Sequence, residues 1–577
     1  MSGAALGVTP SGFGANVFLP GPDGTTHDAI HAALKSAVLS LQGSIGTGVY
    51  NPLEWNCLGN GVTDDTVGFQ NMVNAINAAG GGTVIIPAGF NFPLNDIALC
   101  SNLTILGFGV TSIITQLSGS PYGLSVNAGS GGSSNPTTNI HDITLRGVWL
   151  QGTVLTDGFS EHCYLLNLNA ASRVLVEWCW FVGDRGDAIY IGSGNTAGIE
   201  RHNENITVQN CYFNGQGQLQ RNCISVIDCN HCLIQSNHFT NHTQFAMPGA
   251  IDVEPNSYTF SVIQDIRILN NDFDTIGGSG AVVSVYLPVV QSLLTTPSSG
   301  IIIADNYISD CQTTYAGISV KQLGNAAASS QPNDVTIRDN YCSGTAGSPF
   351  VAWGMAGVLV DGNTFENYPI SSQIGSSNST SACLNITFSN NRSRLVGSSD
   401  DAGLKVFTVT GLNLLNNVYD SCGIPTVLGY GIDFNAGTSD RVTVTGNRFI
   451  AGGIMTVAIQ KEVSHTFTPQ DNIQGLNDFG GLASGFVATS SGSMLPAATT
   501  TVTPGGIASG ASYSTSLAYT NTALGDAVSV SASVNMQGLV VTGYVSVAGT
   551  VVIVVGNLTG STVTLGALTF TVKVTKL

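Results

Sequence analysis

Charged side chains are scarce in this chain of 577 residues: only 9% of its residues are Asp, Glu, Lys or Arg, whereas 43% are hydrophobic. Cations are the scarcer sign, because 17 Lys and Arg stand against 35 Asp and Glu and leave a net charge of -18. This excess of negative charge repels phosphate backbones and argues against nucleic acid as a partner. A neutral or weakly charged partner is expected, and the apolar fraction is large enough for one long continuous core.

Long apolar runs and an N-terminal basic region are also missing. No uninterrupted apolar stretch reaches the length of a membrane-spanning helix, and the first basic residue is Lys35, so the positive region of a secretory signal is absent. The twelve cysteines are scattered rather than spaced as in a small disulfide-rich domain. We expect a protein that is made in the cytoplasm without a signal peptide, is released by lysis, does not insert into membranes, and needs no metal or cofactor.

One short pattern is abundant instead: a β-branched run of alternating polarity that is followed by Asn and usually by an aromatic residue. Intervals of 23 to 35 residues separate its copies, which suits the coils of a solenoid with variable loops. Asn side chains at the same turn of every coil can stack and bond a bend that only Gly, Asn or Asp adopts cheaply. The pattern predicts a parallel β-helix, with a large β-sandwich as the alternative. Its nine asparagines are Asn210, Asn237, Asn271, Asn306, Asn340, Asn363, Asn391, Asn417 and Asn447.

Four regions follow from where this pattern begins and ends. Residues 1–50 are predicted to form an attachment or capping segment with an amphipathic helix over 28–41, and residues 51–465 the β-helix. Residues 466–505, rich in Gly, Ser, Thr and Pro, are predicted to be a linker, and residues 506–577 a small β-sandwich of alternating strands.

The predicted sandwich is almost free of charge. From residue 486 onward only Asp526, Lys573 and Lys576 are charged, and edge-rich strands with so few charges need a covered surface. We therefore favour trimerisation as its role, with glycan binding as the alternative.

Two motifs near the start of the predicted β-helix identify a family resemblance. Gly59-Asn-Gly-Val-Thr-Asp-Asp-Thr66 with Gly80-Gly-Gly-Thr-Val-Ile-Ile-Pro87 resembles the opening signature of the pectate-lyase-like superfamily, which includes many bacteriophage tailspikes. The resemblance implies a right-handed parallel β-helix over about residues 50–460. Asp65 is expected to cap the helix that closes the end of the core, rather than to act with Asp64 in catalysis. The superfamily carries lyases, hydrolases and non-enzymatic adhesins, so the fold leaves function open.

The cysteines allow two interpretations. Cys229-Asn-His-Cys232 has the spacing of metal ligands, and Cys211 and Cys223 on neighbouring coils would complete a zinc site. Alternatively, Cys179 and Cys211 occupy the same position after the turn in adjacent coils, as small residues of a stacked core do. We favour the second interpretation.

The same register aligns a second column of strands, which is expected to be the one entered after each Asn turn. Its rows are Ile189-Tyr-Ile-Gly192, Ile224-Ser-Val-Ile227, Ile251-Asp-Val-Glu254, Val283-Ser-Val-Tyr286 and Ile318-Ser-Val-Lys321. The first and third residues of each row are apolar and face inward, so the second and fourth face outward. The outward residues are predicted to form one exposed patch: Tyr190, Ser225, Asp252, Glu254, Ser284, Tyr286, Ser319 and Lys321.

Within this patch Asp252 and Glu254 form a carboxylate pair. Their Cα atoms are expected about 6.6 Å apart, which suits both retaining and inverting glycoside hydrolysis. Repulsion between the two acids raises one pKa, and Glu254 is predicted to be the general acid. The surrounding motif Gly249-Ala-Ile-Asp-Val-Glu-Pro-Asn256 resembles a stretch found in β-helix proteins of the phage depolymerase type.

Further residues are expected near this pair. Asp187 reaches toward the same groove as a third catalytic acid, or it and Asp184 stabilise a Gly turn and pair with Arg185. Tyr190, Ser225, Tyr286, Lys321 and Trp353 are predicted to bind substrate, Trp353 through its aromatic face. Three residues close in coil order are expected to be turn residues rather than bases: Asp228, His238 and His242.

The sequence thus predicts a phage tailspike that binds and cleaves a bacterial surface polysaccharide, either capsule or lipopolysaccharide, by glycoside hydrolysis. A lyase with Tyr286 or Lys321 as base is one alternative, and a non-catalytic adhesin is the other. The expected assembly is a homotrimer in the virion, attached to the phage tail or baseplate through its N-terminus.

Overall fold

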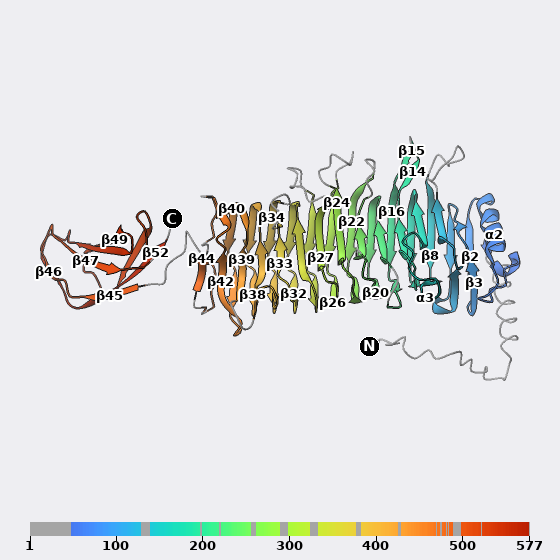
Figure 1. The fold of residues 1–577 in the computed structure, drawn as a ribbon. Helices are drawn as coiled ribbons and strands as arrows, with labels where there is room; N and C mark the ends of the chain where they lie inside the picture. Colours follow the sequence, from blue (N-terminus) through green and yellow to red (C-terminus); the bar gives the residue numbers. More distant parts are fainter. Residues whose placement is uncertain are drawn as a thin grey trace, which may run out of the picture.

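Three long parallel sheets wind into a right-handed parallel β-helix, which confirms the predicted fold class (Figure 1). The computed structural model describes residues 48–575 except 128–138, 197–198, 218–220, 248, 256–260, 289–297, 324–332, 377–381, 425–428, 469, 474–475, 481, 483, 489–497 and 521. The predicted helix over 28–41 and most of the attachment segment lie outside the described residues. Within them, no helix is both long and apolar enough to cross a membrane.

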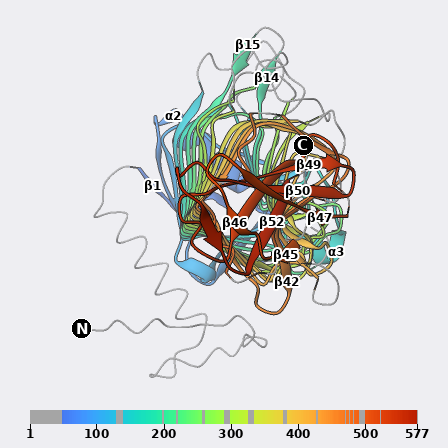
Figure 2. The ribbon, with the colours of Figure 1, turned by 90° about the vertical axis from the view of Figure 1, so that its left-hand side faces the viewer.

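Each full coil passes through one strand of each sheet, here named sheets A, B and C. Viewed along the long axis, the coils lie over one another, and the hairpin β14 (Gly194–Thr196) and β15 (Ile199–Arg201) stands out from them (Figure 2). Sheet A contains, in order, β1 (Val49–Tyr50), β2 (Gly82–Ile85), β5 (Leu103–Leu106), β8 (Ile140–Arg146), β11 (Ala171–Glu177), β16 (Asn203–Gln209), β19 (Cys229–Gln235), β22 (Ile263–Leu269), β25 (Ile301–Ala304), β28 (Val335–Arg338), β31 (Ala356–Asp361), β34 (Cys383–Ser389), β37 (Val409–Leu415), β40 (Gly437–Thr445) and β43 (His465–Phe467).

Sheet B follows the asparagine turn and was not anticipated from the sequence, which predicted two columns of strands. Most of its strands are short and bury one or two side chains, often an aromatic such as Phe213, so they resemble part of a turn when the sequence is read alone. They are β3 (Phe90–Leu94), β6 (Ser112–Gln116), β9 (Trp149–Gln151), β12 (Trp180–Val182), β17 (Tyr212–Asn214), β20 (His238–His242), β23 (Asp272–Ile276), β26 (Tyr307–Cys311), β29 (Tyr341–Gly344), β32 (Thr364–Glu366), β35 (Arg392–Arg394), β38 (Val418–Asp420) and β41 (Arg448–Ile450).

Sheet C completes each coil and carries the five rows aligned above. Its strands are β4 (Ile97–Ala98), β7 (Tyr122–Asn127), β10 (Tyr164–Asn169), β13 (Ile189–Ile191), β18 (Ile224–Val226), β21 (Gly249–Val253), β24 (Ala281–Pro288), β27 (Ala316–Leu323), β30 (Ser348–Trp353), β33 (Ser372–Ile374), β36 (Ala402–Val406), β39 (Gly429–Phe434), β42 (Met455–Lys461) and β44 (Ser484–Ala488).

A helix closes the N-terminal end of the core. Helix α2 (Thr66–Ala78) buries Phe69, Met72, Val73 and Ile76 against the first coils. Asp65 stands at the N-cap position of this helix, but the prediction that it caps the helix is wrong, because its side chain forms no hydrogen bond to the first turn. The carboxylate instead accepts hydrogen bonds from the backbone N–H groups of Leu58 at 2.6 Å and Gly59 at 2.9 Å. Asp65 therefore fastens the preceding loop. Shorter helical turns are η2 (Pro52–Trp55), η3 (Gly109–Thr111) and α3 (Val154–Asp157).

The repeated asparagines form a buried ladder along the molecule. In each rung the Oδ1 atom of the Asn side chain accepts hydrogen bonds from the backbone N–H and from the Nδ2 of the previous Asn, as Asn306 does from Asn271. Its own Nδ2 donates to Oδ1 of the next Asn and to a carbonyl of the preceding coil, which for Asn306 are Asn340 and Ile268. The residue with positive φ is the one directly before each ladder asparagine, as Ser236 is before Asn237. Asn210 also lies one residue too early, because Cys211 pairs in register with the ladder position of Asn237.

Replacing Asn306 with Ala is expected to destabilise the fold. The substitution leaves the backbone N–H of Asn271 without its acceptor in a buried site, which costs about 1 to 3 kcal/mol. It also removes one of the two acceptors of Asn271 Nδ2, which keeps the carbonyl of Ile234, and the donor of Asn306 to the carbonyl of Ile268. Asn413 is the matched control, because it lies on the outward side of β37. Thermal unfolding should show a clearly lower midpoint temperature for Asn306→Ala than for the wild type. For Asn413→Ala the midpoint should stay close to that of the wild type, because its free energy of unfolding should change by less than about 0.5 kcal/mol. Equal midpoints for the two variants would refute the structural role of the ladder.

The residues predicted as a linker contain regular structure at both ends. Asn477 adds a rung to the ladder by accepting from Asn447, and β44 joins sheet C. This last coil was missed because its Gly-rich, charge-poor composition outweighed its Asn-Asp-Phe turn. Farther along, β45 (Ala498–Val502) pairs with a strand of the C-terminal unit.

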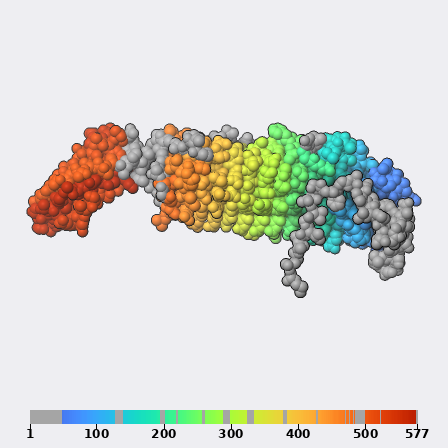
Figure 3. Space-filling view, turned by 90° about the horizontal axis from the view of Figure 1, so that it is seen from below, coloured from blue at the N-terminus to red at the C-terminus, as the bar shows by residue number. Residues whose placement is uncertain are grey.

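The C-terminal unit is antiparallel and has its own small core. Figure 3 shows it beyond the last coils of the β-helix. The core contains Val551, Ile553, Phe570 and Val572, all fully buried. Its remaining strands are β46 (Gly505–Ile507), β47 (Ser512–Ala518), β48 (Ala527–Ala532), β49 (Val540–Val547), β50 (Thr550–Gly556), β51 (Val563–Leu565) and β52 (Leu568–Thr575).

Candidate functional site

The strand register of sheet C aligns the predicted rows as expected. Ile189, Ile224, Ile251, Val283 and Ile318 pair in sequence from β13 to β27. Two outward rows follow from this pairing. The first, here called the Ser row, contains Tyr190, Ser225, Asp252, Ser284 and Ser319; the second, called the Lys row, contains Glu254, Tyr286, Lys321 and Trp353.

The expectation that this patch is exposed is wrong for the Ser row. Asp252 is only 1% exposed, and Ser225 and Ser319 are fully buried, although all three point away from the core of the β-helix. Polar neighbours enclose them: Asn222 donates through Nδ2 to Ser225 Oγ at 2.8 Å and to Asp252 Oδ2 at 3.4 Å. The Lys row is half-buried, so it forms the accessible edge of the site.

Three carboxyl groups meet on this face. Burial raises the pKa of Asp252 well above its usual range, and the neighbouring charges of Glu254 and Asp187 raise it further, while Arg221 opposes the shift. Burial likewise raises the pKa of Asp187 to about 6 against the opposing charge of Arg221. The structure therefore brings together Asp187, Asp252 and Glu254 on one face, and burial favours the protonated forms of Asp187 and Asp252. Asp252 is the more deeply buried member of the pair, at 1% exposure, whereas Glu254 is half-buried, and the role of Glu254 as general acid stays a prediction.

Arg221 was missed in the sequence, although it is the only Lys or Arg between Arg201 and Arg267. Its Nη1 lies 3.3 Å from Asp187 Oδ2, and its Nη2 lies 3.5 Å from Glu161 Oε1. The guanidinium is largely buried, with 18% of the side chain exposed. A lone basic residue directly before an aligned strand was the signal that would have found it.

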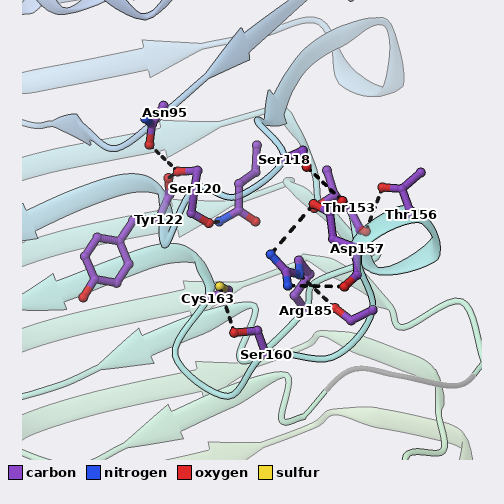
Figure 4. A network of polar contacts seen from close by, with 12 residues as sticks. Asn95, Ser118, Ser120, Tyr122, Thr153, Thr156, Asp157, Ser160, Cys163 and Arg185 are labelled. Carbon is purple, nitrogen blue, oxygen red and sulfur yellow. Dashed lines mark hydrogen bonds and ion pairs between the residues drawn. The ribbon is translucent and has the colours of Figure 1, made fainter.

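The loop that supplies Glu161 is fastened by a polar network (Figure 4). Asp157 accepts from Thr153 Oγ1 at 2.7 Å and from Ser118 Oγ at 2.9 Å, and Arg185 Nη1 lies 3.8 Å from its carboxylate. Arg185 Nε also donates to the carbonyl of Gly158 at 2.8 Å. The predicted pairing of Arg185 with the nearby acids of its own turn is therefore wrong, because its side chain reaches back to this loop.

The other acids and histidines considered in the sequence have partners of their own. Asp184 is fully buried with His242 Nε2 at 3.5 Å, and its charge contributes to the raised pKa of Asp187. Asp228 Oδ1 contacts His202 Nδ1 at 2.9 Å and accepts from the N–H of Val262. His238 contacts Asp272 at 2.8 Å. The contacts of Asp228 and His238 join neighbouring coils, whereas Asp184 and His242 lie two coils apart.

Aromatic side chains flank the carboxyl cluster on both sides. Tyr190 stacks on Tyr164 with ring centroids 4.4 Å apart, and Tyr164 stacks on Tyr122 at 5.7 Å. On the other side, the ammonium of Lys321 lies 5.0 Å from the ring centroids of both Tyr286 and Trp353. The predicted substrate-binding residues therefore lie together on one face of sheet C.

The cysteine motif does not assemble a metal site. Among the described residues, no group of three or more His, Cys, Asp or Glu side chains is arranged to hold a metal ion. All twelve cysteines are buried and unpaired, and burial raises the thiol pKa of Cys229 and Cys211, which disfavours the thiolate that zinc requires. His231 points outward to Asp265 at 2.8 Å.

Comparison with solved structures supports the fold. The chain is similar to a mutant tailspike protein of Escherichia coli bacteriophage HK620 in complex with a pentasaccharide, at 14% identity over 94% of each chain and a TM-score of 0.57. It is less similar to the A-module of mannuronan C-5 epimerase AlgE4 from Azotobacter vinelandii, at 14% identity over 77% of this chain and 100% of that chain and a TM-score of 0.40.

Sequence comparison adds one short match. Forty residues are 52% identical to mannuronan C5-epimerase AlgE1 of Azotobacter vinelandii, which corresponds to 7% of this chain and 3% of the epimerase. No protein-family model matches the chain.

Proposed function

We propose that this protein binds a bacterial surface polysaccharide along sheet C and hydrolyses it at Asp252 and Glu254. The observation that carries the proposal is the buried carboxyl pair beside accessible aromatic rings. Burial favours the protonated form of Asp252, and Glu254 lies beside it, so the pair can provide an acid and a base at one place. The tailspike of similar fold was crystallised with a pentasaccharide, which supports a glycan as the ligand.

The half-buried Glu254 is the member of the pair that can reach a glycosidic oxygen. Burial raises the pKa of Asp252, so this residue holds a proton beside Glu254, and in this proposal Glu254 passes that proton on. In the proposed reaction Glu254 donates this proton to the leaving oxygen as the glycosidic C–O bond breaks. The oxygen of a water molecule bonds to the anomeric carbon, and the partner carboxylate accepts the proton that this water loses.

Asp187 and Arg221 set the charge of the site in this proposal. Asp187 is fully buried at 3.3 Å from Arg221, so it is the most firmly held of the three acids. Its negative charge favours protonation of Asp252, whereas Arg221 prevents the whole cluster from becoming neutral. Ser225 and Tyr190 are proposed to contact the sugar chain on this side, and Tyr286 and Trp353 on the other.

A lyase at the same patch is the second candidate, because burial lowers the pKa of Lys321 to about 8 and makes a neutral amine available as a base. A lyase leaves an unsaturated sugar that absorbs ultraviolet light, whereas a hydrolase does not. A non-catalytic adhesin would bind the glycan and leave its length unchanged.

The test is to incubate the full chain with capsular polysaccharides and lipopolysaccharides from different bacteria and to measure glycan size and ultraviolet absorbance. We expect at least one glycan to become shorter without a rise in absorbance. Shortening with a rise in absorbance would assign the lyase, and binding without shortening would assign the adhesin.

We further propose that the protein is a homotrimeric phage tailspike. The scarcity of charge on the C-terminal unit supports that unit as the trimer contact, and the N-terminal segment is the proposed attachment to the tail. Light scattering of the full chain and of a chain ending at residue 488 should give a trimer and a smaller species, respectively. An unchanged mass after truncation would assign the trimer contact elsewhere.

A further inference from the structure

Lys321 is held among three aromatic rings on the accessible edge of the site. Its ammonium lies 3.7 Å from the ring centroid of Tyr315 and 5.0 Å from those of Tyr286 and Trp353. Within the part of the chain that the structure describes, this ammonium forms neither an ion pair nor a hydrogen bond. Ring faces attract a cation but leave its three N–H donors unused.

Lys405, another lysine on sheet C, has a different environment. Lys405 donates to Asp400 Oδ1 at 2.6 Å and lies 3.2 Å from Asp401 Oδ1, so its charge is matched within the protein. Lys321 has Glu254 near enough to favour its charged form but too far for an ion pair. In a chain with twice as many acids as bases, an unmatched ammonium beside the proposed active site indicates an external anion.

The surroundings of Lys321 contain a further unused donor. The indole Nε1 of Trp353 is buried, can only donate, and has no hydrogen-bond partner among the described residues. The hydroxyl of Ser319, in contrast, interacts with the phenols of Tyr286 and Tyr315. A group with several acceptor oxygens and a negative charge satisfies the indole and the ammonium together.

We propose that Lys321 binds the carboxylate of an acidic sugar in the polysaccharide and so sets which bond is cut. This inference rests on the proposed function and names its substrate class. Lys321 lies two strands beyond Glu254, about 10 Å along the sheet, so the carboxylate belongs to a different sugar from the one that is attacked. The acids around Asp252 repel a carboxylate and the ammonium attracts it, which fixes the register of an acidic repeat.

The charge of Lys321 gives this selectivity a pH limit. Burial lowers the pKa of Lys321 to about 8, with Glu254 opposing the shift, and the phenols that face it do not titrate in this range because burial raises the pKa of Tyr286 to about 12 and that of Tyr315 further. Below pH 8 the ammonium is charged and attracts a carboxylate. As the pH rises through 8 this attraction is lost, unless the bound carboxylate itself holds the proton on Lys321.

The test measures glycan binding in the Glu254→Gln background, where cleavage is blocked. The probes are acidic capsular oligosaccharides in native form and after chemical reduction of their carboxyl groups, and the readout is calorimetric affinity at pH 7. A charge-assisted bond predicts that the native form binds about 10-fold to 100-fold more tightly than the reduced form. Lys321→Met should abolish this preference without weakening the reduced form more than about twofold. Lys321→Arg should retain the preference at pH 7 and at pH 9, because a guanidinium stays charged.

Lys573→Met in the C-terminal unit controls for net charge and should leave the preference unchanged. The inference is overturned if Lys321→Met keeps the preference or if reduced glycans bind as tightly as native ones. The proposed function is judged separately, by whether the wild-type chain shortens the same glycans. Shortening without a charge preference contradicts the inference alone, a charge preference without shortening contradicts the hydrolase alone, and binding of no glycan contradicts both.

Discussion

Asp252→Asn and Glu254→Gln are each expected to lower the kcat for glycan cleavage by about 10³-fold, within the range of 10² to 10⁴ that a positioned acid or base contributes. Either substitution removes the proton exchange of the pair while retaining the shape of the side chain. Affinity for the uncleaved glycan should change far less, because the aromatic rings of the Lys row remain. The measurement is the initial rate of formation of reducing ends.

Asp433→Asn is the matched control for these variants. Asp433 lies outward on β39 of the same sheet, is 1% exposed, and has a pKa raised to about 7 by burial. It lies six strands from Asp252, so it should leave the cleavage rate within about twofold of the wild type. A similar loss in all three variants would indicate a general effect of removing buried acids and would contradict the assigned site.

The Asp252→Asn variant should be at least as stable as the wild type at neutral pH although its kcat is lower. Burial and the charge of Glu254 raise the pKa of Asp252 in the folded state, so folding favours the protonated form. The contribution of Asp252 to stability is therefore complete below about pH 4, the usual range of a carboxyl group, and is lost as the pH rises through the raised value. The uncharged variant should unfold at an equal or higher temperature than the wild type at pH 7.5, which separates loss of catalysis from loss of folding.

Arg221→Met is expected to destabilise the protein by about 3 to 5 kcal/mol, because it leaves the buried carboxylate of Asp187 without its cation. It should also lower the cleavage rate about 10²-fold and move the acidic limb of the pH profile upward, since Arg221 is the charge that holds down the pKa of both Asp187 and Asp252. Arg221→Lys should restore part of the rate. The measurements are the rate of thermal unfolding and the pH dependence of kcat.

Arg267→Met supplies the comparison for this variant. Arg267 pairs with Asp265 at 2.6 Å on the surface, where 51% of its side chain is exposed, so its loss should cost less than about 1 kcal/mol. If the Arg221→Met and Arg267→Met variants had the same rate of thermal unfolding and the same kcat, the result would contradict a role of Arg221 in the site.

The strand register was the most predictable feature of this protein, and its reason is physical. Parallel coils of equal cross-section stack residue on residue, so an inward Ile in one row dictates an inward Ile or Val in the next. This rule predicts that Asp252 and Glu254 share one face. It also explains why Lys321 lies beside Trp353 in the structure, a pairing that was not predicted from the sequence. The ladder of asparagines follows from the same stacking.

Burial could not be obtained from the register. Alternation shows that Asp252 points away from the core, but enclosure depends on side chains from other coils, such as those of Asn222 and Arg221. The ion pair of Arg185 with Asp157 and the role of Asp65 in fastening a loop were missed for a similar reason. Each depends on which of several nearby polar groups a side chain reaches, and spacing along the chain does not decide that.

The central claim is that a glycan lies across Asp252 and Glu254 with its scissile bond at this pair. The most direct test is a crystal structure of the Glu254→Gln variant with an oligosaccharide long enough to span the site. The proposed site predicts a glycosidic oxygen within about 3 Å of the side chain at position 254, with sugar rings continuing over Tyr286 and Trp353. An ordered oligosaccharide bound on sheet A, on sheet B or on the C-terminal unit, with none at sheet C, would contradict it.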